Sequence, residues 1–425
     1  MSGEDARCAS RRGFLQRASL LAAVAGSGFA PAQIAEARPE ATSPGKAIEP
    51  FFGARQGGIL TPAQQHSYFA AFDLESEKKD DVVALLRNWT RASALVTQGK
   101  PADFSPQDLY AAGASTETLG LAPARLTLTF GFGAGLFVKD GRNRYGLAGA
   151  RPDALIDMPR FPGDQLVEAR TGGDVSVQAC ADDPQVAFHA IRQLAQLACG
   201  TARLRWGQTG FLPHSPPNET PRNLMGFKDG TGNPAVQDEA AMTKFVFVGN
   251  EGPAWMRGGS YVVARRILIA LEHWDRTKVD FQEQTMGRHR ATGAPLGKPG
   301  EFDALDFDAA DTNGDPVTPV NSHVRLAAAA SNDGTRILRR GYSYNDGVSY
   351  TAERWPPWHQ GMEYDAGLFF VGYQRDPREG FVKIFSKLAK FDMLNQFSTH
   401  TGGGLFACPG GIAPGEFIGE KLFAA

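Results

Sequence analysis

The order of strand and helix signals repeats along the chain, and this repeat limits the fold more than any other feature of the sequence. Between residues 56 and 215, runs of β-branched and aromatic residues alternate with amphipathic segments in the order strand, helix, strand, strand, helix, strand. A similar order follows between residues 220 and 425. Ferredoxin-like folds have this order, with helices on one face of an antiparallel sheet. The sequence therefore predicts an α+β fold with two ferredoxin-like domains, each an antiparallel sheet flanked by helices.

The N-terminal domain has the clearer element signals. Residues 81–96 carry apolar side chains at helical spacing, and Asp183 is a candidate N-cap for a second helix over 184–197. Strands are expected at 67–72, 126–133, 175–181 and 204–211.

The C-terminal domain follows a segment rich in proline and polar residues, 213–223, which we interpret as the boundary. The stretch 291–321 contains Gly, Pro and Asp and is expected to form a long surface loop that leads to His323. Strands are expected at 245–248, 259–270, 341–344 and 368–373, and helices at 274–286 and 379–391.

The first 37 residues have the features of an export signal. Arg11-Arg12 precedes an apolar stretch at 20–25 and a small-x-small cleavage site, Ala35-Glu36-Ala37. These features predict a twin-arginine signal peptide, followed by a flexible tether over 38–55. Because this route carries proteins that are already folded, it suits a protein that acquires a cofactor in the cytoplasm, and we expect this protein to be periplasmic or secreted.

The composition limits the classes of partner. The 425 residues are 42% hydrophobic and 21% charged with a formal net charge of −2, which gives no electrostatic case for binding nucleic acid or an anionic membrane. Beyond the leader no stretch reaches the roughly 18 to 20 apolar residues of a membrane span, so we expect no stable membrane insertion. The cysteines lack a CxxC or CxxCH motif and indicate buried thiols, with one bridge between Cys180 and Cys199 left open.

The segment 225–234 sets one acid, Asp229, among three glycines, an asparagine and a proline. Glycines allow positive φ and a close approach of the backbone to a ligand, so the acid can act from a tight, solvent-poor turn. An Asp-Gly turn between two strands is the other interpretation. Two later segments bear on this choice: 321–327 places His323 before an apolar run, and 338–344 places two arginines before a glycine and aromatic residues.

This order of a GxxDG loop, an isolated histidine and an arginine before a glycine-aromatic strand resembles the haem-dependent dye-decolourising peroxidases. It is most similar to their exported branch, the deferrochelatase/peroxidase type linked to iron uptake. The resemblance covers most of the chain beyond the leader. Further matching segments are 128–133, 178–185, 258–261 and 367–371.

The resemblance implies a role for each of these side chains. His323 would be the axial ligand of haem b iron, with its second ring nitrogen free for an acceptor. Asp229 would move a proton between the peroxide oxygens, and Arg339 would stabilise the charge that develops as the O–O bond breaks. Arg340 takes that role if the strand register differs by one, and either arginine suits a haem propionate. The residues expected to lie against the cofactor in the same loop are Gly230, Thr231 and Gly232.

The sequence thus predicts a haem b peroxidase that reduces hydrogen peroxide and oxidises dye-like or phenolic reductants. The alternatives are a deferrochelatase that releases iron from haem, a haem carrier that works with iron-uptake components, and a ferredoxin-like binding module without haem. The resemblance also implies a homo-oligomer, either a dimer or a hexamer. Electron relay from bulky substrates through Trp355, Trp358 or Tyr364 is left open. Candidates for an apolar pocket lining, each of which also suits an ordinary core, are Phe247, Trp255, Met256, Phe370 and Phe406.

Overall fold

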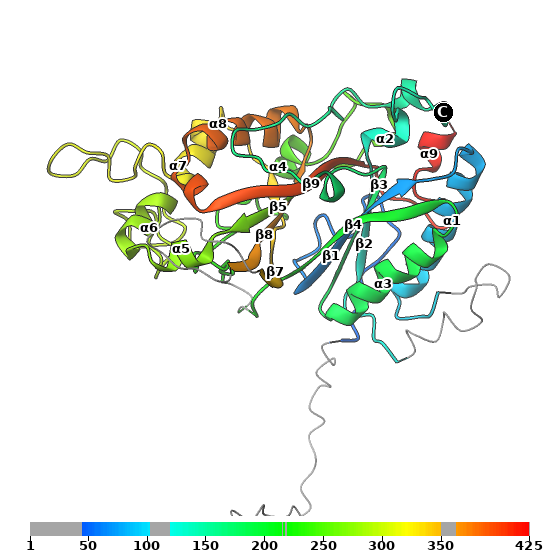
Figure 1. Cartoon of the computed structure of the whole chain (residues 1–425), viewed down its shortest axis with the longest axis horizontal. Coiled ribbons are helices and arrows are strands. Elements are labelled where there is room, and N and C mark those ends of the chain that lie inside the picture. The colour runs from blue at the N-terminus through cyan, green and yellow to red at the C-terminus, as the bar shows by residue number, and fades with distance from the viewer. Residues whose placement is uncertain (1–44, 103–119, 215, 217–218, 350–362, 425) are drawn as a thin grey trace, which may run out of the picture. The chain divides into compact units, whose positions relative to one another are not determined.

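The strands of the chain form one antiparallel sheet that closes on itself (Figure 1). The computed structural model describes residues 45–102, 120–214, 216, 219–349 and 363–424. Its strands are β1 His66–Leu74, β2 Thr127–Phe132, β3 Val175–Ala181, β4 Ala202–Phe211, β5 Ser260–Ile269, β6 Leu338–Arg339, β7 Tyr342–Ser349, β8 Glu363–Gln374 and β9 Ser398–Cys408. Within these residues the strand order is β5-β9-β2-β3-β1-β4-β7-β8-β6, and a further pairing of β5 with β8 closes a barrel beside which β6 lies.

Each half of the chain supplies one half of this barrel. The N-terminal strands lie in the order β4-β1-β3-β2, and the C-terminal strands in the order β9-β5-β8-β7. The halves meet where Phe132 of β2 pairs with Ala407 of β9, and where Phe211 of β4 pairs with Ser343 of β7. The prediction of antiparallel strands accompanied by helices is confirmed, but the joining of the two expected sheets into one was not predicted.

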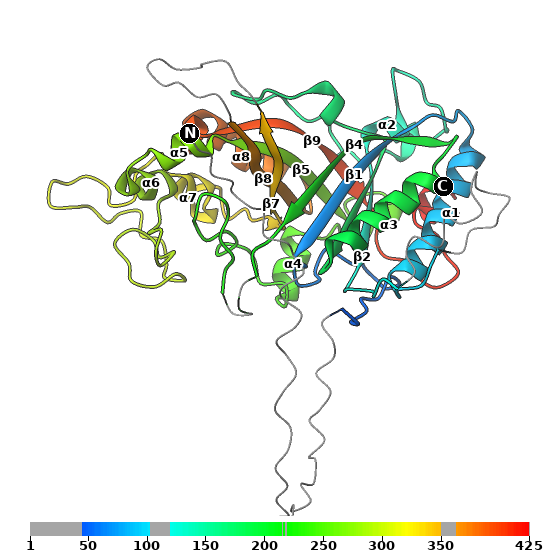
Figure 2. The ribbon, with the colours of Figure 1, turned by 60° about the horizontal axis from the view of Figure 1, so that its bottom comes forward.

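Helices cover the outside of the barrel. The α-helices are α1 Lys79–Val96, α2 Ala134–Phe137, α3 Pro184–Leu197, α4 Glu239–Phe245, α5 Leu271–Asp275, α6 Val279–Met286, α7 His323–Ala327, α8 Lys383–Phe391 and α9 Glu420–Phe423. Figures 1 and 2 place α1 and α3 side by side over the N-terminal strands, with α7 and α8 over the C-terminal strands. A side-chain hydrogen bond joins α1 to α3, because the indole N–H of Trp89 in α1 donates to Leu194 O of α3 at 2.8 Å.

The element predictions hold better in the N-terminal half than in the C-terminal half. All four strands and both helices of the first half end within two residues of the predicted ends, and Asp183 caps α3 through the N–H groups of Gln185 and Val186. The predicted strand 245–248 is wrong, because Asp238 caps α4 and the helix runs on to Phe245. The predicted helix 274–286 is interrupted between α5 and α6, and the first part of 379–391 is a π-helical turn before α8.

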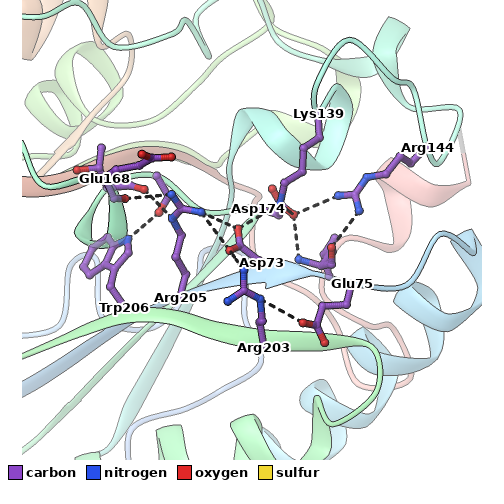
Figure 3. Close-up of polar contacts among 12 residues, drawn as sticks. Asp73, Glu75, Lys139, Arg144, Glu168, Asp174, Arg203, Arg205 and Trp206 are labelled. Carbon is purple, nitrogen blue, oxygen red and sulfur yellow. Dashed lines mark hydrogen bonds and ion pairs between the residues drawn. The ribbon is translucent and has the colours of Figure 1, made fainter.

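Two buried carboxylates hold one end of the N-terminal strands together (Figure 3). Asp73 of β1 and Asp174, next to β3, are almost fully buried. Lys139 bridges them, at 3.1 Å from Asp73 Oδ1 and 2.8 Å from Asp174 Oδ2. Arg205 of β4 adds a contact to Asp73 Oδ2 at 3.1 Å, and Arg144 lies 3.1 Å from Asp174 Oδ2. These ion pairs join β1, the start of β3 and β4 to the segment after α2.

The cysteines that the structure describes form no disulfide bond. Cys180 and Cys408 are buried and Cys199 is exposed, and all three are free thiols, so the bridge between Cys180 and Cys199 is not formed. Among the helices that the structure describes, none has both the length and the apolar character needed to cross a membrane. The leader, the start of the tether, and Trp355 and Trp358 lie outside the described residues.

Candidate active site

A cavity of about 550 Å³ brings the candidate site residues together. Its walls come from the loop 225–233, strands β5 and β8, helices α7 and α8, and part of the insertion 291–321. Asp229, His323 and Arg339 all line it. Gly230, Thr231 and Gly232 line it as well. Its apolar lining includes Ile267, Ile269, Leu368, Phe370, Ile384, Phe385 and Leu388.

Asp229 reaches the cavity because its loop turns back sharply. The backbone N–H of Asp229 donates to Pro221 O at 2.8 Å, which fixes the loop against the preceding segment. Gly226 and Gly230 have φ of 84° and 127°, in the left-handed region that favours glycine. The carboxylate is therefore presented from a turn whose path depends on these two glycines.

Arg339 contacts Asp229 directly. Its Nη1 donates to Oδ1 of Asp229 at 3.2 Å across 110 residues of sequence. Asn233 fixes the two segments relative to each other, because its Nδ2 donates to Arg339 O at 2.8 Å and its Oδ1 accepts from Arg339 N–H at 3.1 Å. The sequence indicated the acid and the arginine but not Asn233, whose only signal was its place in the same loop.

His323 begins α7 and is oriented by a carboxylate that the sequence analysis did not identify. Its Nδ1 lies 2.6 Å from Oδ2 of Asp392, and the other oxygen of Asp392 accepts from Leu394 N–H at 2.8 Å. Asp392 is only 3% exposed, whereas 28% of the His323 side chain remains accessible. Because a carboxylate only accepts hydrogen bonds, Nδ1 carries the proton and Nε2 is left for a metal.

The same contact sets the ionisation of the imidazole. Burial alone would lower the pKa of His323, but the charge and the hydrogen bond of Asp392 outweigh it and raise the pKa above its ordinary value. A carboxylate partner also makes the imidazole a better donor to a metal. The acceptor that the resemblance implied for the second ring nitrogen is therefore Asp392.

Arg340 does not lie in the cavity. Its guanidinium donates to Thr61 O and, at 3.2 Å, to Gln64 Oε1, and the side chain is buried on the opposite side of the strand from Arg339. Arg340 therefore lies away from the cavity that the other predicted cofactor-binding residues line. Of the predicted pocket residues only Phe370 lines the cavity. Phe406 instead packs in the barrel against Phe69, with ring centroids 5.8 Å apart.

Cationic side chains gather around the cavity. Lys228, Arg288 and Arg336 line it together with Arg339. Arg288 donates from Nη1 to Gly293 O at 2.7 Å, and burial lowers the pKa of its guanidinium. Acidic groups on a bound molecule are therefore favoured at this cavity, since guanidinium groups pair well with carboxylates.

These residues fit iron protoporphyrin. The apolar walls suit the porphyrin ring, the cations suit its two propionates, and His323 offers one nitrogen for an axial bond. Within the described residues no group of three or more His, Cys, Asp or Glu could hold a bare metal ion. A metal bound by His323 would therefore take most of its ligands from a group such as a porphyrin.

Both halves of the chain match models of one protein family. Residues 56–212 match the family model "Dyp-type peroxidase, N-terminal", and residues 220–413 match "Dyp-type peroxidase, C-terminal". A dye-decolorizing peroxidase of Thermobifida fusca is 38% identical over 385 residues, which cover 87% of this chain and 84% of that protein. The deferrochelatase of Escherichia coli K12 is 37% identical over 425 residues, covering 97% of this chain and 96% of that protein.

Solved structures agree with the sequence relatives. A DyP-type peroxidase from Streptomyces coelicolor is 39% identical and superimposes with a TM-score of 0.81, covering 91% of this chain and all of the other. The ferric form of DtpA from Streptomyces lividans gives the same identity, TM-score and coverage. The overall fold is therefore shared with a protein solved as a DyP-type peroxidase.

Proposed function

The chain belongs to the Dyp-type peroxidase family, and from this membership we propose how its cavity carries out the reaction. It is a haem-dependent peroxidase, and its cofactor is haem b. The observation that carries the proposal is the 3.2 Å ion pair of Asp229 and Arg339 in the same cavity as the carboxylate-bound His323.

We assign the binding of haem to His323 and the cationic lining. Nε2 of His323 would bind the haem iron, and Asp392 holds the imidazole ring in the orientation that this bond would need. Arg288 and Arg336 are suited to the propionates. The loop residues Gly230 and Gly232 have no side chain, so the backbone can approach the porphyrin closely.

The reaction with peroxide requires a proton transfer and a fixed positive charge. Bound haem supplies the electrons that break the O–O bond. Asp229 accepts the proton from one oxygen of hydrogen peroxide and returns it to the other, which leaves as water. Arg339 stabilises the negative charge that builds on the leaving oxygen and holds Asp229 in place through their ion pair. Dye-like or phenolic molecules then return the electrons.

One experiment tests this assignment. The haem-loaded protein should oxidise a dye only when peroxide is present, and His323→Ala should fold but retain little haem, because only apolar and propionate contacts remain. The ratio of Soret to protein absorbance reports the haem content. A ratio and a spectrum unchanged in His323→Ala would reject the axial role, and a haem-loaded wild type that fails to react with peroxide would reject the proposed mechanism.

Release of iron from haem is the second candidate function. The observation that favours it is the match of 97% of this chain to a protein named deferrochelatase. Analysis of haem products with and without peroxide separates the two functions. Free iron with an intact porphyrin ring would indicate iron release, and an intact haem together with oxidised dye would indicate peroxidase turnover.

The strand order supports a finer description of the fold. Numbered within each half, with the two-residue strand β6 left out, the strands follow the order 4-1-3-2, which is β4-β1-β3-β2 and β9-β5-β8-β7. We infer that each half is a ferredoxin-like unit, with the boundary in the segment 213–223.

Export by the twin-arginine route is also part of the proposal, and it is supported by the arginine pair, apolar stretch and cleavage site of the leader. Replacing Arg11 and Arg12 with lysine should keep the precursor in the cytoplasm, because a receptor reads the arginines and not the charge alone. Cell fractionation measures this, and unimpaired export of the double-lysine form would indicate the general secretory route.

A further inference from the structure

Glu301, in the insertion between α6 and α7, contacts the loop on both sides of Asp229. Its Oε2 accepts from Lys228 Nζ at 2.5 Å, and its Oε1 accepts from Thr231 Oγ1 at 2.9 Å. The two charged side chains are mostly buried, with 9% of Glu301 and 15% of Lys228 exposed. A single carboxylate therefore fixes the residues before and after the Asp229-Gly230 pair.

The insertion is packed tightly enough to hold this carboxylate in place. Arg288 donates to the backbone O of Glu301 at 2.9 Å and to that of Gly293 at 2.7 Å. Gly293 has φ of 77°, and a Cβ at this position would lie 2.7 Å from Cδ of Lys228. Burial alone would raise the pKa of Glu301, but hydrogen bonds from Lys228, Thr220 and Thr231 lower this pKa below its ordinary value. The carboxyl group therefore stays ionised.

The loop is held at its far end by Asn233. This residue exchanges two hydrogen bonds with the backbone of Arg339, as described above. Asp229 therefore lies in a short segment fixed by Glu301 at Lys228 and Thr231, and by Arg339 through Asn233. A change at Glu301 frees the two side-chain contacts on either side of Asp229, while the backbone bond of Asp229 to Pro221 and the bonds of Asn233 to Arg339 remain.

We propose that Glu301 is a positioning residue for the reaction with peroxide, which acts by holding Asp229 against Arg339. This inference rests on the proposed function of Asp229 as the proton carrier. A displacement of about 1 Å at a reacting group can slow a reaction about 100-fold. Glu301 does not line the cavity, so its effect on the reaction must pass through Asp229 and must disappear when Asp229 no longer carries the proton.

The test is a double-mutant cycle with Glu301→Gln and Asp229→Asn. Stopped-flow mixing of each haem-loaded protein with peroxide should show that Glu301→Gln slows the reaction about tenfold in the wild-type background and less than about twofold in the Asp229→Asn background. Hydrogen exchange of residues 225–233 should rise in Glu301→Gln, while the Soret spectrum and haem content stay unchanged. The matched control is Asp306→Asn, which breaks a more exposed 3.5 Å pair with Lys298 in the same insertion and should change neither readout.

Each result decides the proposal. An equal loss of rate in both backgrounds would show that Glu301 acts elsewhere, and an unchanged rate or unchanged exchange would overturn its positioning role. Should Glu301→Gln fail to fold, Thr231→Val removes one of the two contacts and should give the same pattern with a smaller loss. A wild type that does not react with peroxide would reject the proposed function instead, and the exchange measurement would still report whether Glu301 holds the loop.

Discussion

Two aspartates at the cavity differ in what they contact, and this difference assigns them different chemistry. Asp229 is half-buried and forms an ion pair with Arg339. One of its carboxylate oxygens, Oδ1, accepts the hydrogen bond from the guanidinium. Asp392 is almost fully buried and faces the imidazole of His323. A carboxylate with one oxygen not engaged by the arginine can exchange a proton with a substrate, whereas a buried carboxylate bonded to a ligand histidine mainly orients it.

Asp229→Asn should slow the reaction with peroxide without loss of haem. The amide keeps the size and some hydrogen bonding but cannot accept the peroxide proton, so we expect a loss of roughly 100-fold or more. The measurement is stopped-flow mixing with peroxide at matched haem content, with the exposed Asp157→Asn as the control. Near wild-type rates would make Asp229 a turn residue and leave the chemistry to Arg339 and ordered water.

Asp392→Asn should weaken the hold on haem while His323 is still present. The amide cannot take the place of the negative charge beside Nδ1, and loss of such a partner typically costs about 10- to 100-fold in affinity. Transfer of haem to an excess of apomyoglobin measures the change. If haem left the variant and the wild type at the same rate, Asp392 would serve only the packing after α8.

The residues that sequence analysis missed share one property. Asp392 lies 69 residues from His323, and Glu301 lies 70 from Thr231, so no local pattern connects the partners. Asp229 and His323 were found because glycines and an apolar run mark their own surroundings. Long-range partners are fixed by the tertiary packing, and for this reason only the need for an acceptor, not its identity, could be predicted.

At the scale of elements, the short strand β6 decides which arginine reaches the cavity. β6 pairs with β8, with Arg339 opposite Gly372, and neighbouring residues of a strand face opposite sides. Arg339 therefore meets Asp229, and Arg340 points to Thr61 and Gln64.

Arg339→Leu and Arg340→Leu should consequently fail in different ways. Loss of a fixed donor at the reacting oxygen costs about 100-fold or more in rate, so Arg339→Leu should react slowly with peroxide and keep its stability. Arg340→Leu should react at a near-normal rate but lose roughly 1 to 3 kcal/mol of stability, because Thr61 O and Gln64 lose a buried partner. Stopped-flow rates and urea unfolding of both variants test this, and equal small effects would reject a role of Arg339 at the site.

The element errors have local causes. The missed strand β9 contains three consecutive glycines, 402–404, which look like a loop in sequence. In the structure a Cβ at Gly403 would lie 2.0 Å from Ala264 O, so the strand needs glycine to pair closely with β5. The wrongly predicted strand at 245–248 is apolar and short, and such runs do not distinguish a strand from the end of a helix.

At the scale of the whole molecule, closure of the barrel determines where haem can bind. The interior is filled by aromatic side chains, among them Phe69 stacked on Trp206 with ring centroids 5.3 Å apart. The cavity consequently lies outside the barrel, under α7 and α8. The sequence shows the strand pattern of each half, but β2 and β9 meet through a single residue pair, which leaves no pattern in the sequence.

The ion pairs among the N-terminal strands (Figure 3) should make the stability of the whole barrel depend on pH. Burial alone would raise the pKa of Asp73, but its hydrogen bonds and ion pairs with Lys139 and Arg205 lower it below the ordinary value of 3.8. Since the folded state holds this proton less tightly than the unfolded chain, the contribution of Asp73 is complete above that value. It is lost as the pH falls through the lower, folded-state pKa.

Asp73→Asn should therefore destabilise the protein by roughly 3 kcal/mol near neutral pH. The substitution removes the buried negative charge with which Lys139 and Arg205 form ion pairs. The difference from wild type should narrow as the pH falls below 3.8, where the wild-type carboxylate is also being protonated. Urea unfolding of both proteins at neutral and acid pH measures this, with the exposed Asp157→Asn as the control. A difference that stays the same at every pH would show that Asp73 contributes by shape and hydrogen bonding alone.

Asp73 does not line the cavity, so the reaction of the folded variant with peroxide should be unchanged at neutral pH. This second measurement separates the stability of the barrel from the chemistry on its outer face.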